Sequence, residues 1–179
     1  PMVGPIILTS GQGRVRIFMM NVLISVNKCY LDKAKTMLHS LRRNNSEDVT
    51  VYLINHSLNC AELKKFRNYL QKHLRMDLVV MDVSTTAFDQ LPFSNRFSIE
   101  MYYRVIAQFL LPQTVDRIMW LDADIVICGT ISDFYHQDFE GALLTACPDV
   151  NCEDKEIIRI KENLGLSKGH TYFNSGVLL

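Results

Sequence analysis

The stretch Asp116-Arg-Ile-Met-Trp-Leu-Asp-Ala-Asp-Ile-Val-Ile127 decides the fold, because an apolar run leads directly into two aspartates. We predict a buried strand at 115–121, and ligands of parallel sheets bind at the carboxyl ends of the strands. Asp122 and Asp124 flank the small residue Ala123, so both carboxylates can face one hard divalent cation. Aspartates at strand ends are also common as turn formers and helix caps, and this motif alone leaves that reading open.

Strand and helix patterns alternate on both sides of this stretch, which predicts an α/β fold with a mostly parallel, Rossmann-like central sheet flanked by helices. Strands are expected at 22–26, 49–54, 78–83, 115–121 and 142–146, with a last strand from Tyr172. Helices are expected from Leu31, at 61–74, 131–135 and 153–164, and before Pro112. In the helix before Pro112, five residues share the face expected to be buried: Ile99, Tyr102, Tyr103, Ile106 and Phe109.

Length and composition bound the class of protein. At 179 residues and 48% hydrophobic content, the chain is long enough for one domain with a sizeable core. We expect residues 1–19 to be an extension and residues 20–179 to form the catalytic core. Nineteen basic residues balance nineteen acidic ones, which argues against a nucleic-acid partner.

The cysteines bear on location. They are odd in number, five, and show no CxxC spacing, which favours reduced thiols and a cytoplasmic protein. Attachment to the inner membrane surface and the oligomeric state are left open by the sequence.

Five segments in a fixed order carry a family resemblance. The stretch 116–127 is preceded by Asn21–Tyr30 and Glu100–Arg104 and followed by Ala146–Asp149 and Tyr172–Leu178. Together these segments resemble the motifs of bacterial family 8 glycosyltransferases. The resemblance implies the GT-A fold of nucleotide-diphospho-sugar transferases. It also implies transfer of a hexose, galactose or glucose, from a UDP-sugar to a hydroxyl of a glycan or glycolipid acceptor, with retention and with bound Mn²⁺ or Mg²⁺.

The resemblance assigns roles to single residues. The uridine would lie on the loop after the first strand, at Ser25, Val26, Asn27 and Tyr30, with the Tyr30 ring stacked on the base. The metal ligands would be Asp122 and Asp124, with Ala123 between them in the donor site. The donor-sugar pocket would be lined by Arg104, Asp149 and Asn174.

Two departures from the family pattern modify these expectations. Asn27, Lys28 and Cys29 stand where acidic or amide residues are frequent, so uridine preference is less secure than metal use. Leu179 precedes the point at which the family supplies a histidine as a third metal ligand, so the core is expected to be incomplete at its C-terminus, with weakened metal binding and low turnover.

Two other functions fit parts of the sequence. A haloacid-dehalogenase-type phosphatase also uses an Asp-x-Asp motif at a strand end, although that motif ordinarily follows the first strand. A non-catalytic domain that binds a nucleotide sugar is the second alternative.

Overall fold

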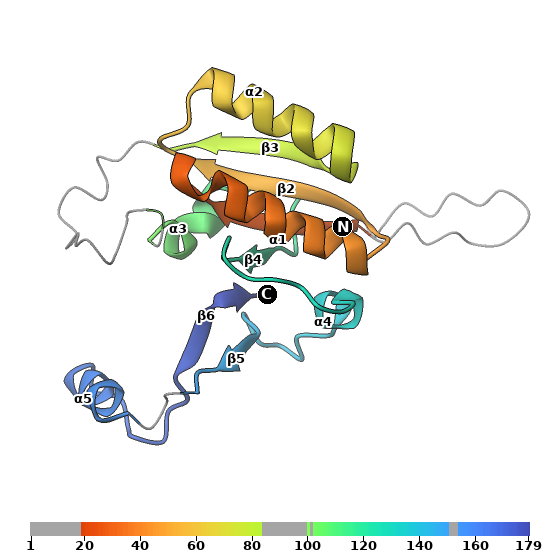
Figure 1. The fold of residues 1–179 in the computed structure, drawn as a ribbon. Coiled ribbons are helices and arrows are strands. Elements are labelled where there is room, and N and C mark those ends of the chain that lie inside the picture. The colour runs from red at the N-terminus through yellow and green to blue at the C-terminus, as the bar shows by residue number, and fades with distance from the viewer. Residues whose placement is uncertain (1–18, 84–99, 101, 151–153) are drawn as a thin grey trace, which may run out of the picture.

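The computed structural model describes residues 19–83, 100, 102–150 and 154–179. Its centre is a six-stranded sheet with the strand order β3-β2-β1-β4-β6-β5 (Figure 1). The strands are β1 (Met19–Ser25), β2 (Asp48–Asn55), β3 (Asp77–Asp82), β4 (Met119–Leu121), β5 (Ala146–Pro148) and β6 (Phe173–Leu178). The predicted α/β class with a mostly parallel sheet is confirmed.

Strand direction defines a switch point between β1 and β4. Strands β1, β2, β3 and β4 run parallel, whereas β6 is antiparallel to both of its neighbours, β4 and β5. From β1 the chain proceeds to β2 and β3 on one side and returns to β4 on the other side. In open α/β sheets, ligands bind outside the carboxyl ends of the strands at such a reversal.

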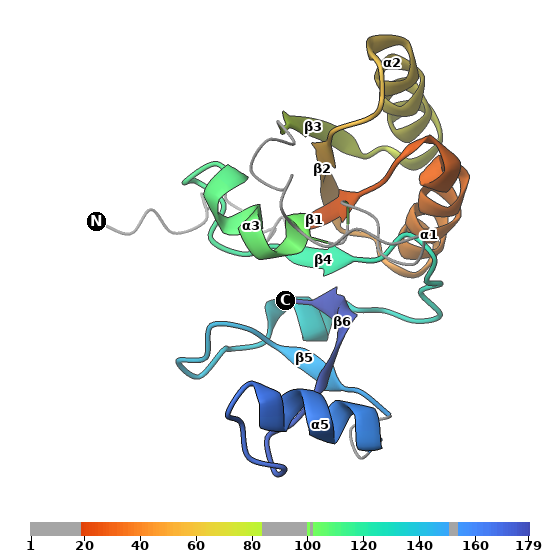
Figure 2. The same cartoon turned by 90° about the vertical axis from the view of Figure 1, so that its left-hand side faces the viewer.

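Helices cover both faces of the sheet. One face carries α1 (Leu31–Asn44) and α2 (Cys60–Tyr69), which continues into the π-helical turn η2 (Leu70–Leu74), and α3 (Tyr103–Leu110) covers the other face (Figure 2). The short α4 (Ser132–His136) follows β4, and α5 (Lys155–Asn163) lies beside β5 and β6. These helices bury the apolar side chains of the sheet in two clusters.

Apolar periodicity explains the two helices on the first face. In α1, Ala34, Leu38 and Leu41 recur at helical spacing and are fully buried against the sheet. Helix α2 begins with a capping box, in which the Asn59 side chain accepts from the Glu62 backbone and Glu62 accepts from the Asn59 backbone. Both helices were predicted from the same pattern.

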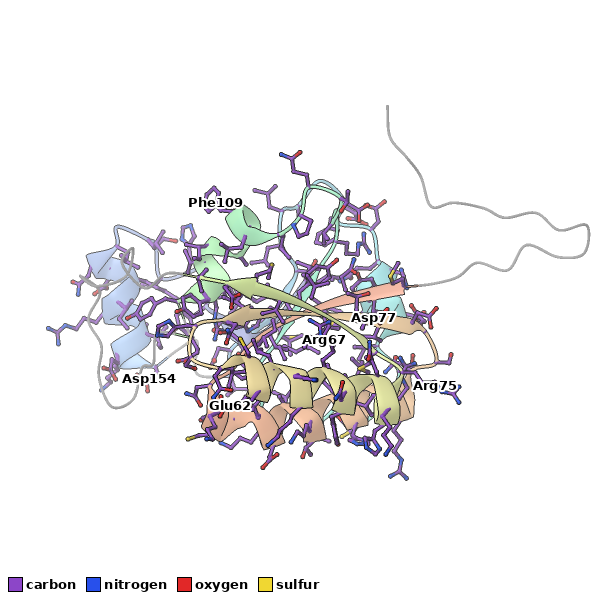
Figure 3. All side chains as sticks on the ribbon, turned by 90° about the horizontal axis from the view of Figure 1, so that it is seen from above. Glu62, Arg67, Arg75, Asp77, Phe109 and Asp154 are labelled. Atoms are coloured by element: carbon purple, nitrogen blue, oxygen red, sulfur yellow. The ribbon has the colours of Figure 1, made fainter. Side chains whose placement is uncertain are left out.

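Three predicted details are wrong. The strand predicted at 115–121 is a strand only at 119–121. Residues 142–144 form no strand, because Glu140 and Gly141 both have positive φ and turn the chain, which leaves Leu143 fully exposed before β5. Phe109 is 78% exposed rather than buried, and Figure 3 shows it on the α3 side of the sheet, pointing away from α2.

Other expectations have partial outcomes. Tyr103, the first residue of α3, is buried in a cluster with Leu23 and Trp120, and Tyr102 and Ile106 pack partly against that cluster. Ile99 lies outside the described residues. Met19 already belongs to β1, and residues 1–18 lie outside the described part of the chain. Four described cysteines, Cys29, Cys60, Cys128 and Cys147, are free thiols. Across the described ranges, every helix is too short or too polar to span a bilayer.

Candidate donor-binding site

The candidate site lies where the carboxyl ends of β1 and β4 meet. Leu23 pairs with Trp120, so extending the parallel register by two residues brings Ser25 level with Asp122. On the other side of β4, the backbone N–H of Asp122 donates to the carbonyl oxygen of Gly176 at 2.8 Å. Asp122 is therefore fixed at the switch point by its position between β1 and β6.

The Asp122 carboxylate is held by two donors from the protein. Its Oδ1 accepts a hydrogen bond from Trp120 Nε1 at 2.8 Å and one from Arg104 Nη2 at 3.2 Å. Trp120 reaches it because residues two apart in a strand point to the same face. Arg104 reaches it from α3, which packs on that face. The structure thus brings together two of the predicted site residues, Arg104 and Asp122.

The amino end of β6 adds an amide and a second carboxylate to the same edge of the sheet. Because β6 is antiparallel to β4 and β5, its first residues lie beside the carboxyl ends of those strands. Asn174 Nδ2 lies 3.4 Å from Asp149 Oδ2, and the Asp149 backbone N–H donates to the carbonyl oxygen of Tyr172 at 2.8 Å. The predicted sugar-pocket residues Asp149 and Asn174 are therefore neighbours.

Gly176 joins these two groups. A Cβ on Gly176 would lie 3.1 Å from Asp122 Oδ2 and 3.1 Å from Asn174 Oδ1, which is tighter than almost all real Cβ contacts. The Asn174 side chain is fixed there because its Oδ1 accepts from the Gly176 backbone N–H at 2.8 Å. The missing side chain of Gly176 thus lets two oxygen atoms from different strands converge.

These oxygens fit a divalent cation in chemistry. Asp122 is half-buried and Asp124 is exposed, and both carry the carboxylate oxygens that Mg²⁺ and Mn²⁺ prefer. Among the described residues, both hydrogen bonds to the Asp122 carboxylate go to Oδ1, so Oδ2 keeps its lone pairs for a cation. Within the described ranges, no three His, Cys, Asp or Glu side chains form a metal-binding group, so Asp122 and Asp124 would supply two ligands and a bound diphosphate or water the others.

The loop after β1 has its own internal hydrogen bonds. Asn27 Oδ1 accepts from the Cys29 backbone N–H at 3.1 Å and so caps the short helix η1 (Lys28–Tyr30). Ser25 Oγ donates to the carbonyl oxygen of Ile54 at 3.2 Å. Val26 is buried, as is Ala123 after β4, so only their backbone groups can face a ligand.

Tyr30 is exposed at the end of η1. Its ring is 38% exposed, and the ammonium of Lys33 lies 3.9 Å from the ring centroid. The predicted stacking residue is therefore partly exposed to solvent, with a cation over one face of its ring.

An ion pair connects this loop to α2. Lys28 Nζ lies 3.0 Å from Glu62 Oε1, and Glu62 lies at the start of α2 (Figure 3). The hydrogen bond from the Asn59 backbone N–H, followed by the hydrogen bond from Lys28, lowers the pKa of Glu62. Lys28, which differs from the family pattern, thus links the loop after β1 to the first turn of α2.

Three residues of the site were not predicted from the sequence: Trp120, Ser175 and Gly176. Trp120 could have been found, because strand alternation places it on the same face as Asp122. Ser175 could not, because its hydroxyl accepts a hydrogen bond at 2.6 Å from Arg104, which is 71 residues away in the sequence. Such pairs depend on how α3 crosses the sheet.

Comparisons with known proteins identify the class that this fold and site define. Residues 21–179 match the profile of glycosyl transferase family 8, and the chain belongs to this family. Family membership removes the phosphatase alternative. Lipopolysaccharide 1,2-glucosyltransferase of Escherichia coli K12 is 30% identical over 161 residues, which cover 89% of this chain and 46% of the relative. Glycosyltransferase GlyE of Streptococcus pneumoniae is 26% identical over 88% of this chain and 34% of its own length.

Solved structures share the fold. The galactosyltransferase LgtC, crystallised with donor and acceptor sugar analogues, superposes with a TM-score of 0.78 at 20% identity, over 89% of this chain and 56% of LgtC. The structure of GlyE gives a TM-score of 0.60 at 23% identity, over 90% of this chain and 33% of GlyE. The chain thus spans about half the length of the Escherichia coli relative and about a third of the length of GlyE.

Proposed function

We propose that this chain forms the donor-binding part of a glycosyltransferase that moves a hexose from a UDP-sugar to a hydroxyl of a glycan or glycolipid, with retention at the anomeric carbon. The observation that carries the proposal is the placement of Asp122, which follows β4 and is fixed between β1 and β6 at the switch point of the sheet. Nucleotides bind at this point of an open α/β sheet, and family membership supports the same reading.

The charges of the site support metal-assisted donor binding. A diphosphate placed beside Asp122 and Asp124 would meet two carboxylates, and only one of these pairs with a described cation, Arg104. A bound Mn²⁺ or Mg²⁺ would offset this repulsion and stabilise the departing nucleoside diphosphate. Asp122 and Asp124 are the residues that would hold such an ion.

The remaining groups would bind the two ends of the donor. Tyr30, which is partly exposed, would stack on the uracil, and the backbone groups around Val26 and Asn27 would bind between the base and the diphosphate. Asp149 and Asn174, joined at 3.4 Å, present an acceptor and an amide to sugar hydroxyls. These groups would select and orient the hexose through hydrogen bonds.

Glucose and galactose are the proposed donor sugars. The Escherichia coli relative is, by its name, a lipopolysaccharide glucosyltransferase, which agrees with the glycan or glycolipid acceptor that we propose here. We propose that the protein is located in the cytoplasm or at the inner membrane surface.

A donor panel tests this function. Calorimetric titration of UDP, CDP, GDP, UDP-glucose and UDP-galactose into the 179-residue chain, with manganese present, should show binding of the uridine ligands only. The sugar with the larger gain over UDP identifies the donor. Equal binding of all nucleotides, or no binding of any, would contradict the proposal.

A further inference from the structure

The two oxygens of the Asp122 carboxylate have different surroundings. Oδ1 accepts hydrogen bonds from Trp120 Nε1 at 2.8 Å and Arg104 Nη2 at 3.2 Å. Oδ2 lies over the backbone of Gly176, 3.1 Å from the point where a Cβ would be. Because two donors bind the same oxygen, the carboxylate cannot rotate without losing both of them.

Arg104 is itself held in place by two residues of the site. Its guanidinium carbon lies 4.9 Å from the centroid of the Trp120 indole ring, and its Nη1 donates to the Ser175 hydroxyl at 2.6 Å and to the Ser175 carbonyl oxygen. The Arg104 side chain is only 12% exposed. An arginine side chain has many rotamers, so these contacts pre-order a group that would otherwise be mobile.

The second aspartate of the motif is not held in this way. Asp124 is exposed, and among the described residues its carboxylate has no hydrogen-bond or ion-pair partner. The Asp-x-Asp motif therefore combines one carboxylate with a fixed orientation and one that can adjust to its ligand. A fixed group binds with less loss of entropy than a mobile one.

We propose that Trp120 and Ser175 are positioning residues of the donor site, which act with Arg104 to bind Oδ1 of Asp122 to the protein and so present Oδ2 to the cation and donor. This inference rests on the proposed function, because the donor is the ligand that Oδ2 would meet. Trp120 acts on the carboxylate directly, and Ser175 acts through Arg104. Neither residue needs to touch the donor.

The role of Ser175 can be tested by the fluorescence of Trp120. Trp120 is the only tryptophan of the chain, and its indole N–H contacts Asp122, so tryptophan fluorescence should respond to UDP and manganese at this site. Loss of one charge-assisted hydrogen bond predicts about tenfold weaker UDP binding in Ser175→Ala. Ser175→Thr keeps the hydroxyl and should recover most of the affinity. Ser46→Ala, at an exposed serine before β2, is the matched control and should bind like the parent chain.

The role of Trp120 must be tested by calorimetry, because Trp120→Phe removes the tryptophan fluorescence. Phenylalanine keeps an aromatic ring beneath Arg104 and removes only the indole N–H, so about tenfold weaker binding of UDP with manganese is expected. Trp120 is buried, and circular dichroism must show that the variant is folded. If it does not fold, the comparison of Ser175→Ala with Ser175→Thr decides the proposal.

The outcomes separate this inference from the proposed function. The positioning roles are overturned if Ser175→Ala and folded Trp120→Phe bind UDP as tightly as the parent chain while Asp124→Asn loses manganese-dependent binding. If Asp124→Asn also binds like the parent chain, or the parent chain itself does not bind UDP, the proposed donor site fails and the positioning roles fail with it.

Discussion

Asp122, the residue after β4, contacts Gly176 of β6 in two ways at the candidate site: the Asp122 backbone N–H donates to the Gly176 carbonyl oxygen at 2.8 Å, and Asp122 Oδ2 lies 3.1 Å from the position of a Cβ on Gly176. The carboxylate and the neighbouring strand are thus in contact through a residue that has no side chain. A methyl group at this point would compete with the carboxylate for the same space.

Gly176→Ala should therefore weaken donor binding. The Asp122 carboxylate, or the Asn174 amide beside it, would have to shift by a few tenths of an ångström. Overpacking of this kind predicts about a tenfold loss of affinity for UDP with manganese. Gly129→Ala is the control, because a Cβ on Gly129 would meet nothing within 4 Å. Unchanged affinity in Gly176→Ala would show that the carboxylate tolerates displacement.

Asp149→Asn should separate sugar recognition from nucleotide recognition. Asp149 lies beside Asn174 on the β5 and β6 side of the site, so its charge should bind sugar hydroxyls and not the base. We expect at least about tenfold weaker binding of the preferred UDP-sugar and unchanged binding of UDP, measured by calorimetry. Asp133→Asn, at an exposed aspartate of α4, should change neither. Equal losses for both ligands would place Asp149 elsewhere in the site.

Tyr30→Ala should weaken binding of every uridine ligand. Stacking on an aromatic ring contributes roughly 1–3 kcal/mol per base, which corresponds to an affinity loss of about fivefold to about a hundredfold. Tyr30→Phe keeps the ring and the contact with Lys33 and should bind UDP like the parent chain. Parent-like affinity of Tyr30→Ala would mean that the base lies away from η1.

Tyr103 should make the fold sensitive to high pH. Burial at the start of α3, with a smaller contribution from Glu100, raises the pKa of Tyr103 from 10.0 to about 12. The folded state holds this proton more tightly than the unfolded state, so the stabilisation is complete below pH 10.0 and is lost as the pH rises toward about 12. Urea unfolding at increasing pH should show a smaller decline in the free energy of unfolding for Tyr103→Phe than for the parent chain. Equal declines would contradict the assignment.

The sequence was sufficient for the parallel half of the fold. The strands that became β1, β2 and β3 are continuous apolar runs, and the Ala34, Leu38 and Leu41 repeat of α1 fits a single buried face. The antiparallel half was less predictable. Residues 142–144 are apolar enough for a strand, but the positive φ of Glu140 and Gly141 turns the chain. Because glutamate rarely adopts a positive φ, the sequence does not predict this turn.

Helix α3 shows a second limit of sequence patterns. Phe109 lies six residues after the buried Tyr103 and so on a different side of the helix, whereas Ala107 and Leu110, four and seven residues after Tyr103, pack against the cluster formed with Leu23 and Trp120. An apolar pattern that spreads around a helix does not say which side the sheet will cover. The same limit concealed Ser175, because its contact with Arg104 depends on where α3 crosses β6.

Manganese dependence of UDP binding in Asp124→Asn is the most direct test of the central claim that the Asp-x-Asp motif holds a metal-bound donor. Calorimetric titrations would compare the parent chain, Asp124→Asn and the control Asp133→Asn, each with manganese and with chelator. The account predicts binding by the parent chain and by Asp133→Asn only when manganese is present, and loss of that binding in Asp124→Asn. Binding that is equal with chelator, or that survives in Asp124→Asn, would contradict it.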